Sequence, residues 1–197
     1  MLSQRVFGIL LASAVVSASA RGEIRAIDAK PSTLTVHVGK SGMFSAFGDN
    51  HVIRAPIVSG KVDDGPQPSV EILVDARQMM VLDPELTLAK RAEVQKRMRG
   101  PEVLDVERFA EIRFRSTAVT PSGSGRWRVA GVLELHGRTA PLSFEVTTAE
   151  GRVRGAATVS HRAFGIEPIS IAGGTVKVRD DVKIDFDIVT EGKSRGK

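Results

Sequence analysis

The residues of this chain best suited to chemistry are its four histidines and the carboxylates close to them. His51 follows Asp49 by two residues, and residues two apart on a strand point to the same side. An imidazole and a carboxylate placed in this way could chelate a metal ion. The other histidines, His37, His136 and His161, stand in no dense ligand motif. Two ligands do not complete a site and Asp-Asn is ordinary turn chemistry, so we expect no bound metal.

The remaining polar residues do not form a catalytic set that the sequence can identify. The chain has no G-x-S-x-G motif, and it has no cysteine to serve as a thiolate nucleophile or to form disulfides. Asp185 and Asp187 alternate with apolar neighbours, which predicts that they lie on a solvated strand face. We therefore expect no catalytic residue and no cofactor. A metal-assisted hydrolase that uses His51 and Asp49 is the weaker alternative.

Apolar and polar residues alternate along most of the chain. This pattern predicts the β-strands on which any functional site must be built. The alternation is clearest in Thr33–Val38, Arg126–His136, Pro141–Thr147 and Val182–Val189. A period of two is the period of a β-strand, and one-sided strands are typical of antiparallel sheets with one dry face. About eight such strands can close into a barrel with an apolar interior. The sequence predicts an all-β fold, an antiparallel barrel.

Turn signals divide some of these strands. We expect Glu23–Ile27 and Ser32–Gly39 to be separate strands at the start of the fold. Thr175–Arg179 and Val182–Val189 are expected to be two further strands, joined by a turn at Asp180-Asp181.

One segment, near residues 84–99, has the features of a helix. Asp83 could cap its first turn, Pro84 suits the first helical position, and Gly100-Pro101 ends it. The segment is rich in lysine and arginine, so we expect a surface helix that lies across the barrel.

The first twenty residues resemble a signal peptide. Arg5 precedes the apolar run Val6–Val16, which is too short to span a bilayer, and Ala18-Ser19-Ala20 is a cleavage signal. We expect cleavage after Ala20 and a periplasmic protein. A single domain is expected over residues 21–191, followed by a disordered tail over residues 192–197.

The chain carries a formal net charge of +5. A solvated basic surface accounts for this charge, and contact with an anionic membrane surface is the alternative. Nucleic-acid binding is disfavoured because the chain has no tyrosine and one tryptophan, and so has few platforms on which bases could stack. The sequence predicts no oligomeric state.

The apolar strand faces are the second candidate site. They place Phe144 and Phe186 on the dry face and Glu145 on the solvated face. The interior could be a filled core or a cavity for an elongated ligand, and the sequence leaves both open. The candidate ligand-binding residues are Phe44, Phe47, His51, Ile53, Phe114, Leu133, Leu135, Phe144, Phe164 and Phe186.

Five segments, in this order along the chain, together resemble the YceI-like proteins, which are exported lipid- or polyisoprenoid-binding barrels. They are Phe44–His51, Arg108–Ser116, Gly131–Thr139, Arg162–Ile166 and Gly173–Val178. The chain departs from the family pattern at Ala110, where a proline is usual, and at Glu134, where a threonine is frequent. Asp49 stands where a subgroup of the family carries a histidine.

The resemblance implies an extended, lipocalin-like barrel whose interior holds a long isoprenoid or fatty chain. The leading hypothesis is a periplasmic binding or carrier protein for such an amphiphilic lipid. Its polar head is expected at a mouth near His51 or the basic helix. The alternative is a structural or stress-related protein with a filled core that acts through its surface.

Overall fold

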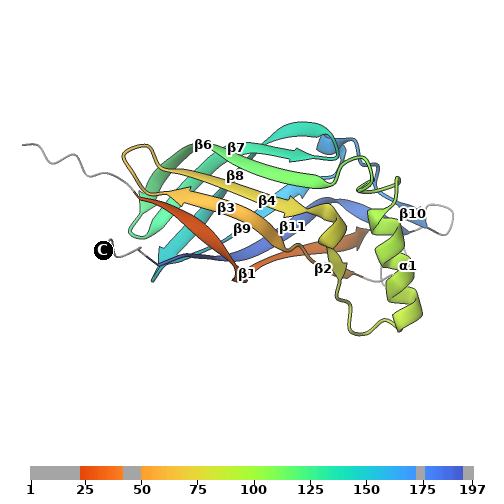
Figure 1. Cartoon of the computed structure of the whole chain (residues 1–197). Helices are drawn as coiled ribbons and strands as arrows, with labels where there is room; N and C mark the ends of the chain where they lie inside the picture. Colours follow the sequence, from red (N-terminus) through yellow and green to blue (C-terminus); the bar gives the residue numbers. More distant parts are fainter. Residues whose placement is uncertain (1–22, 42–49, 172–175, 193–197) are drawn as a thin grey trace, which may run out of the picture.

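The computed structural model describes residues 23–41, 50–171 and 176–192, and these residues form one sheet with a single α-helix (Figure 1). The longer strands are β1 (Ile24–Ser41), β3 (Ile57–Asp63), β4 (Ser69–Asp75), β6 (Glu111–Gly123), β7 (Arg126–Leu135), β8 (Arg138–Ala149), β9 (Arg152–Ser160) and β11 (Val176–Thr190). Shorter elements are β2 (His51–Arg54), β5 (Met80–Val81), β10 (Ser170–Ile171), α1 (Leu88–Arg99) and the 3-10 turns η2 (Ala76–Gln78) and η3 (Arg162–Phe164).

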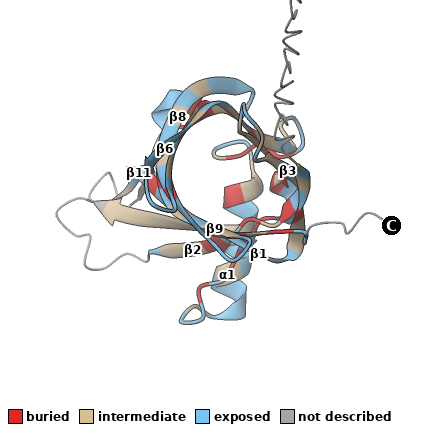
Figure 2. Ribbon diagram, turned by 90° about the vertical axis from the view of Figure 1, so that its left-hand side faces the viewer, coloured by how far each residue is buried: buried red, intermediate tan, exposed pale blue. Residues whose placement is uncertain are grey.

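The eight longer strands close into an antiparallel barrel, as predicted. The sheet runs in the order β11-β9-β8-β7-β6-β4-β3-β1, and β1 pairs with β11 to complete the ring. Leu34 lies opposite Phe186 at this closure. Seen along the axis, the strands form a ring around the interior (Figure 2). Because the barrel is closed, each of these eight strands has a neighbour on both sides. Closure thus removes the open sheet edges that could pair with another chain.

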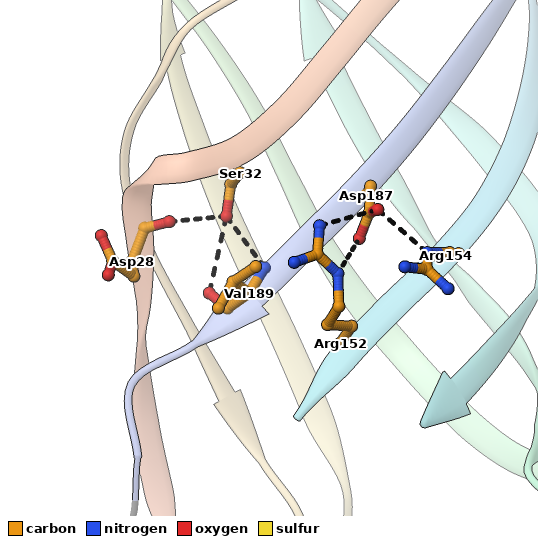
Figure 3. A network of polar contacts seen from close by, with 6 residues as sticks. All are labelled: Asp28, Ser32, Arg152, Arg154, Asp187 and Val189. Carbon is orange, nitrogen blue, oxygen red and sulfur yellow. Dashed lines mark hydrogen bonds and ion pairs between the residues drawn. The ribbon is translucent and has the colours of Figure 1, made fainter. Parts of the chain in front are cut away.

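The expected break in the first strand is wrong, because β1 passes through it as one strand with a bulge. The register with β11 shifts between Asp28 and Thr33. The hydroxyl of Ser32 donates to the carbonyl of Asp28 (2.6 Å) and accepts from the N–H of Val189 (2.9 Å) (Figure 3). Ser32 thus supplies hydrogen bonds that the irregular backbone lacks, and the strand continues.

The turn expected at Asp180-Asp181 is also wrong, because both residues lie inside β11. Asp181 pairs with Ser160 across the β9–β11 ladder. The Asp180 carboxylate accepts from the Ser160 hydroxyl (2.8 Å) and the Arg162 N–H (2.9 Å). The Asp180 side chain therefore anchors the start of η3, which follows β9, and does not form a turn within β11.

The helix is shorter than expected, and Asp83 does not cap it. The Asp83 side chain is fully buried and accepts from the Val52 N–H (2.7 Å) and from Nδ1 of His51 (2.6 Å). Since both carboxylate oxygens are engaged with β2, the helix begins later, where the Thr87 hydroxyl accepts from the Lys90 N–H (3.3 Å).

Helix α1 does not lie across the barrel; it stands at one end, beside the edge strand β5 (Figure 1). The Gln95 amide accepts from the Val81 N–H (2.8 Å) and donates to the Met79 carbonyl (2.9 Å). This side chain pairs with the edge of β5 much as another strand would. Met98 is buried, whereas Leu88 is 81% exposed. No helix in the described part of the chain combines the length and apolar character needed to cross a bilayer.

The fully packed part of the interior lies at the α1 end of the barrel. The segment after α1 folds back onto it, with the Val106 N–H donating to the Arg99 carbonyl (3.1 Å). The buried side chains gathered at this end include Ile53, Ala55, Met79, Val81, Met98, Leu104, Val106, Phe164 and Ile166. They cover this end of the barrel.

Candidate functional site

The barrel encloses an apolar cavity of about 570 Å³. All eight longer strands contribute to its wall, which is mostly aliphatic and aromatic. A volume of this size lies within the range of roughly 300–1,000 Å³ typical of small-molecule sites. The interior is therefore a cavity and not a filled core.

Side-chain exposure supports the same conclusion. Leu34, Ile72, Leu142 and Ile184 point into the barrel, yet each is only half-buried. In a filled core these side chains would be in contact with others on all sides. Their exposed surface faces the cavity and is available to a ligand.

Three phenylalanines form a row on the cavity wall. The ring centroids of Phe114 and Phe144 lie 5.3 Å apart, and those of Phe144 and Phe186 lie 5.4 Å apart with nearly perpendicular planes. Both spacings are those of favourable aromatic pairs. The row joins β6, β8 and β11 around the wall.

Five of the ligand-binding candidates line the cavity: Phe114, Leu133, Leu135, Phe144 and Phe186. Phe144 and Phe186 face the interior and Glu145 is exposed, in agreement with the predicted strand faces. Two further candidates, Phe44 and Phe47, lie outside the described residues.

The other three candidates, His51, Ile53 and Phe164, do not belong to the cavity wall. Ile53 and Phe164 are buried in the packed α1 end. They were expected in the site as apolar residues of the barrel, Ile53 in a predicted strand and Phe164 at the start of a predicted loop. The pattern marks the dry side of the sheet but does not show where side chains from α1 and its neighbours fill it.

His51, which is partly exposed, pairs with the buried Asp83 on the α1 side of the fold. Two hydrogen bonds fix the Asp83 carboxylate, and the carboxylate in turn orients the imidazole. In the described ranges, 23–41, 50–171 and 176–192, no group of three potential ligand side chains could hold a metal ion. Asp49, the other expected ligand, lies outside those ranges. The pair joins the segment before α1 to β2.

The polar part of the cavity wall lies at the end opposite α1, on the left of Figure 1. We call this end the mouth, and its polar lining residues are Arg25, Asp63, Asp64, Ser69, Thr148, Glu150, Arg152 and Thr190. None of these residues was predicted as a site residue, because they occur at strand ends and in the turns between strands. Their signal there is the ordinary signal of a hairpin turn.

Arg25 is the central contact of the mouth. Its Nη2 donates to Oδ2 of Asp64 (2.9 Å) and its Nη1 donates to the Thr190 hydroxyl (3.1 Å). The N–H of Glu23 also donates to the Asp64 carboxylate (3.0 Å). The Nε of Arg25 is buried and has no hydrogen-bond partner among the described residues.

A second arginine cluster lies beside the mouth, on the outer face (Figure 3). Arg152 donates to both oxygens of Asp187 (3.0 and 2.8 Å), and Arg154 donates to Oδ2 (2.9 Å). The hydrogen bonds from Arg152 are the main cause of the lowered pKa of Asp187. Asp187 is therefore not simply solvated, as the sequence predicted, but binds two arginines.

His161 also lines the cavity, at the end of β9 on the α1 side. Its Nδ1 donates to the carbonyl of Arg179 (3.3 Å). Burial lowers the pKa of the imidazole, so His161 is neutral near pH 7.

Comparison with known proteins identifies the family. The model of the YceI-like domain matches residues 26–190, which is the whole barrel apart from the first two residues of β1. This chain belongs to the YceI-like family. A UPF0312 protein of Vibrio parahaemolyticus is 33% identical over 73 residues, covering 37% of this chain and 39% of the relative. A UPF0312 protein of Pseudomonas fluorescens is 32% identical over 114 residues, covering 53% of this chain and 55% of the relative.

Solved structures share the YceI-like fold at low sequence identity. BcnA of Burkholderia cenocepacia has a TM-score of 0.65 and 17% identity, covering 84% of this chain and 99% of that chain. A polyisoprenoid-binding domain of Saccharophagus degradans, implicated in plant cell wall breakdown, has a TM-score of 0.58 and 12% identity. It covers 85% of this chain and 97% of its own. At such identities the likeness concerns the fold alone.

Proposed function

We propose that this YceI-like protein binds a long-chain amphiphilic lipid, an isoprenoid or a fatty chain, inside its barrel and carries it through the periplasm. The observation on which the proposal rests is the continuous apolar cavity, whose inward side chains are left half-exposed. The Saccharophagus neighbour, which has the same fold, is described as a polyisoprenoid-binding domain. A chain in the cavity would cover the apolar surface that the protein leaves open.

The driving force of this binding is the removal of apolar surface from water. Each Å² of apolar surface that is buried contributes about 25 cal/mol, so a long chain can bind with few polar contacts. The row formed by Phe114, Phe144 and Phe186 offers ring faces and edges along the path of the chain. A wall of this kind selects ligands by shape and length more than by functional group.

The polar head of the lipid is proposed to lie at the mouth. The head was predicted to lie near His51 or the basic helix, but His51 is not part of the cavity wall. Apart from His161, the polar wall residues, with Arg25 among them, gather at the opposite end. A chain that enters tail first would reach toward the packed α1 end and leave its head at Arg25.

Binding without chemistry is part of the proposal. The His51–Asp83 pair is the arrangement most similar to a catalytic dyad, and it lies away from the wall that would contact a ligand. A general base must come within hydrogen-bond reach of the group it deprotonates. Turnover of a bound lipid that requires His51 would contradict this part of the proposal.

Export remains a proposal that rests on the sequence of the first twenty residues. N-terminal sequencing of protein recovered from the periplasm of its own host should begin at Arg21. Recovery only from the cytoplasm, with Met1 intact, would contradict the periplasmic role.

Blocking the cavity tests the binding proposal directly. Leu133 and Leu135 line the cavity on β7, whereas Glu134 between them is exposed on the outside. Leu135→Trp should lower the affinity for a fluorescent fatty acid or isoprenoid at least tenfold, because the indole occupies the path of the chain. Glu134→Trp is the matched control and should leave affinity unchanged.

Native mass spectrometry of protein purified from the periplasm of its own host tests independently whether a lipid is bound. A co-purifying lipid that is lost in Leu135→Trp supports the carrier proposal. Equal binding by the wild type and both tryptophan variants would show that any lipid binds outside the barrel.

A further inference from the structure

Exposed apolar side chains gather at the α1 end of the molecule. Five large apolar side chains are exposed among the residues that the structure describes, and three of them lie from β5 to the first residue of α1. These three are Met80, Leu82 and Leu88, and Leu88 is 81% exposed. The other two, Ile24 and Val58, lie singly on β1 and β3. A single exposed apolar residue needs no explanation, whereas a group of them marks an interaction surface.

Strand pairing places Met80 and Leu82 on the outer side of the sheet. Met80 lies opposite Arg54 on β2, and Nη2 of Arg54 lies 4.0 Å from the sulfur of Met80. The neighbouring pair, Ile53 with Val81, is buried and points to the packed interior. Because successive side chains of a strand point to opposite faces, Met80, Leu82 and Arg54 point outward. Apolar and basic side chains thus share one outer face beside α1.

Basic residues dominate the same end of the molecule. We define the β2–β5–α1 surface as Arg54, Met80, Leu82 and residues 84–99. Its six basic residues are Arg54, Lys90, Arg91, Lys96, Arg97 and Arg99, and its two acidic residues are Glu85 and Glu93. The formal charge of this surface is therefore +4. Arg97 also forms an exposed ion pair with Glu102, which lies just beyond the surface (3.3 Å).

Two of these charges are held in place by groups that do not neutralise them. Arg91 donates from Nη2 to the carbonyl of Leu86 (3.3 Å), and Arg99 donates from Nη2 to the carbonyl of Met79 (2.9 Å). A carbonyl oxygen orients a guanidinium group but carries no net charge that would offset it. The β2–β5–α1 surface therefore presents a positive field to its surroundings.

The position of α1 makes this surface accessible to a large, flat partner. Seen along the barrel axis, α1 projects beyond the ring of strands (Figure 2). The mouth lies at the opposite end of the barrel (Figure 1). None of the residues of the surface, all of which the structure describes, lines the cavity. A partner that covers the β2–β5–α1 surface therefore leaves the mouth uncovered.

A bilayer with anionic headgroups fits both properties of the surface. Lysine and arginine attract lipid phosphates, and exposed leucine side chains can enter the boundary between the headgroups and the acyl chains. A second copy of this chain fits less well, because two surfaces of charge +4 would repel each other. A nucleic acid would use the cations but would gain nothing from Leu82 and Leu88.

We propose that the β2–β5–α1 surface docks the protein on a bilayer that contains anionic lipids. Leu82 and Leu88 enter the headgroup region, while Lys90 and Lys96 contact lipid phosphates. The docking is separate from the binding of a lipid chain inside the barrel, since it uses the packed end of the molecule. It holds the protein at the membrane with the mouth uncovered.

Sedimentation with vesicles tests the docking. Sucrose-filled vesicles of phosphatidylcholine with about one third phosphatidylglycerol provide an anionic bilayer, and vesicles of phosphatidylcholine alone provide a neutral one. At low salt the protein should bind the anionic vesicles at least tenfold more tightly than the neutral ones. High salt should reduce this ratio, because it screens the charges. All variants are purified from the same host, so their first twenty residues are processed alike and do not affect the comparison.

Leu88→Ser tests the apolar contact. Because the Leu88 side chain is exposed, the substitution should leave the fold intact and weaken binding to the anionic vesicles at least threefold. Ile24→Ser is the matched control. It removes another exposed apolar side chain, next to Arg25 at the mouth, and should leave the affinity unchanged.

Lys90→Gln combined with Lys96→Gln tests the charge. A basic residue near an anionic bilayer contributes about fivefold to affinity, so the loss of two should weaken binding at least tenfold at low salt. Lys61→Gln combined with Arg126→Gln is the matched control, because it removes the same charge from β3 and β7. This control should bind within about twofold of the wild type.

Leu135→Trp separates docking from the carrier function, because it fills the cavity and leaves the surface unchanged. Vesicle binding that persists in Leu135→Trp supports docking, whereas binding that is lost in Leu135→Trp and retained in Leu88→Ser would overturn it. Equal binding to neutral and anionic vesicles, or equal losses in the surface variants and their controls, would overturn it as well. A dimer that Leu88→Ser dissociates in sedimentation velocity would make the surface an interface between copies of this chain instead. Thermal melting of each variant checks that it is folded.

Discussion

The ring of Phe186 occupies the space that a side chain at Gly155 would need. The two residues are direct partners on β11 and β9, and a Cβ at position 155 would lie 2.7 Å from Cζ of Phe186. Gly131, which pairs with Ser116, makes a similar contact with Phe114, where a Cβ would lie 2.6 Å from Cζ. In both places the missing side chain lets an aromatic ring lie along the wall. The two glycines thereby keep the rings from projecting farther into the cavity.

Gly155→Ala should therefore affect both stability and binding. The added Cβ would collide with Phe186 and with the carbonyl of Glu145, which lies at 2.7 Å. We expect a loss of about 1–3 kcal/mol in the free energy of unfolding, typical of overpacking. Lipid affinity should fall because the displaced ring narrows the cavity. Urea denaturation and lipid titration measure the two effects.

A double-mutant cycle checks that the ring is the cause. Phe186→Leu should relieve part of the cost of Gly155→Ala, with a coupling energy of roughly 0.5–3 kcal/mol. Gly192→Ala is the control, because a Cβ there meets nothing within 4 Å. Additive effects of the two substitutions would show that only the backbone contact matters.

Phe144 and Phe164 should respond differently to truncation. Phe164 is 3% exposed in the packed α1 end, so Phe164→Ala should cost about 3–5 kcal/mol. Phe144 is half-buried beside a cavity that already exists, so Phe144→Ala should cost roughly 1–3 kcal/mol. The measurement is urea unfolding of lipid-free protein. Equal, large losses would mean that the cavity is closed in solution.

His51→Ala should weaken the fold and spare lipid binding. Its removal leaves the fully buried Asp83 carboxylate with one of its two hydrogen bonds, that from the Val52 N–H, at an expected cost of about 1–3 kcal/mol. Because His51 is not in the cavity wall, the Kd for a fluorescent lipid should stay within twofold of the wild type. A changed preference between lipid heads in this variant would place the head at the α1 end instead of the mouth.

His161 should make stability depend on pH below neutrality. Burial lowers the pKa of its imidazole in the folded state, whereas the unfolded chain takes up the proton near pH 6.5. Its contribution is therefore complete above about pH 6.5 and is lost as the pH falls toward the lowered value, by at most about 1.4 kcal/mol per pH unit.

Chemical denaturation of the wild type and His161→Asn between pH 7.5 and 5 tests this linkage. The difference in unfolding free energy between the two proteins should shrink as the pH falls, because carboxylate titrations are common to both. Parallel curves would mean that His161 titrates alike in the folded and unfolded states.

The period-two alternation was sufficient to predict the barrel. It correctly placed Phe144 and Phe186 inside and Glu145 outside, because strand geometry assigns alternate residues to opposite faces wherever the strand lies in the fold. The end of the helix at Gly100 was also predictable, since the signal is local.

Local signals failed where a distant residue changed their meaning. Asp83 has the sequence features of a helix cap, but the Val52 N–H and His51 engage it from another element. Asp180 has the features of a turn residue, but Ser160 and Arg162 bind its carboxylate across the sheet. Such contacts override local preference because they satisfy buried or constrained polar groups that the local alternative would leave unpaired.

The sequence by itself determined that the chain forms an antiparallel barrel whose strands turn their apolar face to the interior. Only the tertiary structure decided where that interior is packed and where it is open. Ile53 and Phe164 are apolar like Leu133 and Phe144, yet the first two are packed at the α1 end and the last two line a cavity. The physical reason is that alternation specifies which side of a strand is dry, whereas packing depends on what the rest of the chain brings to that side.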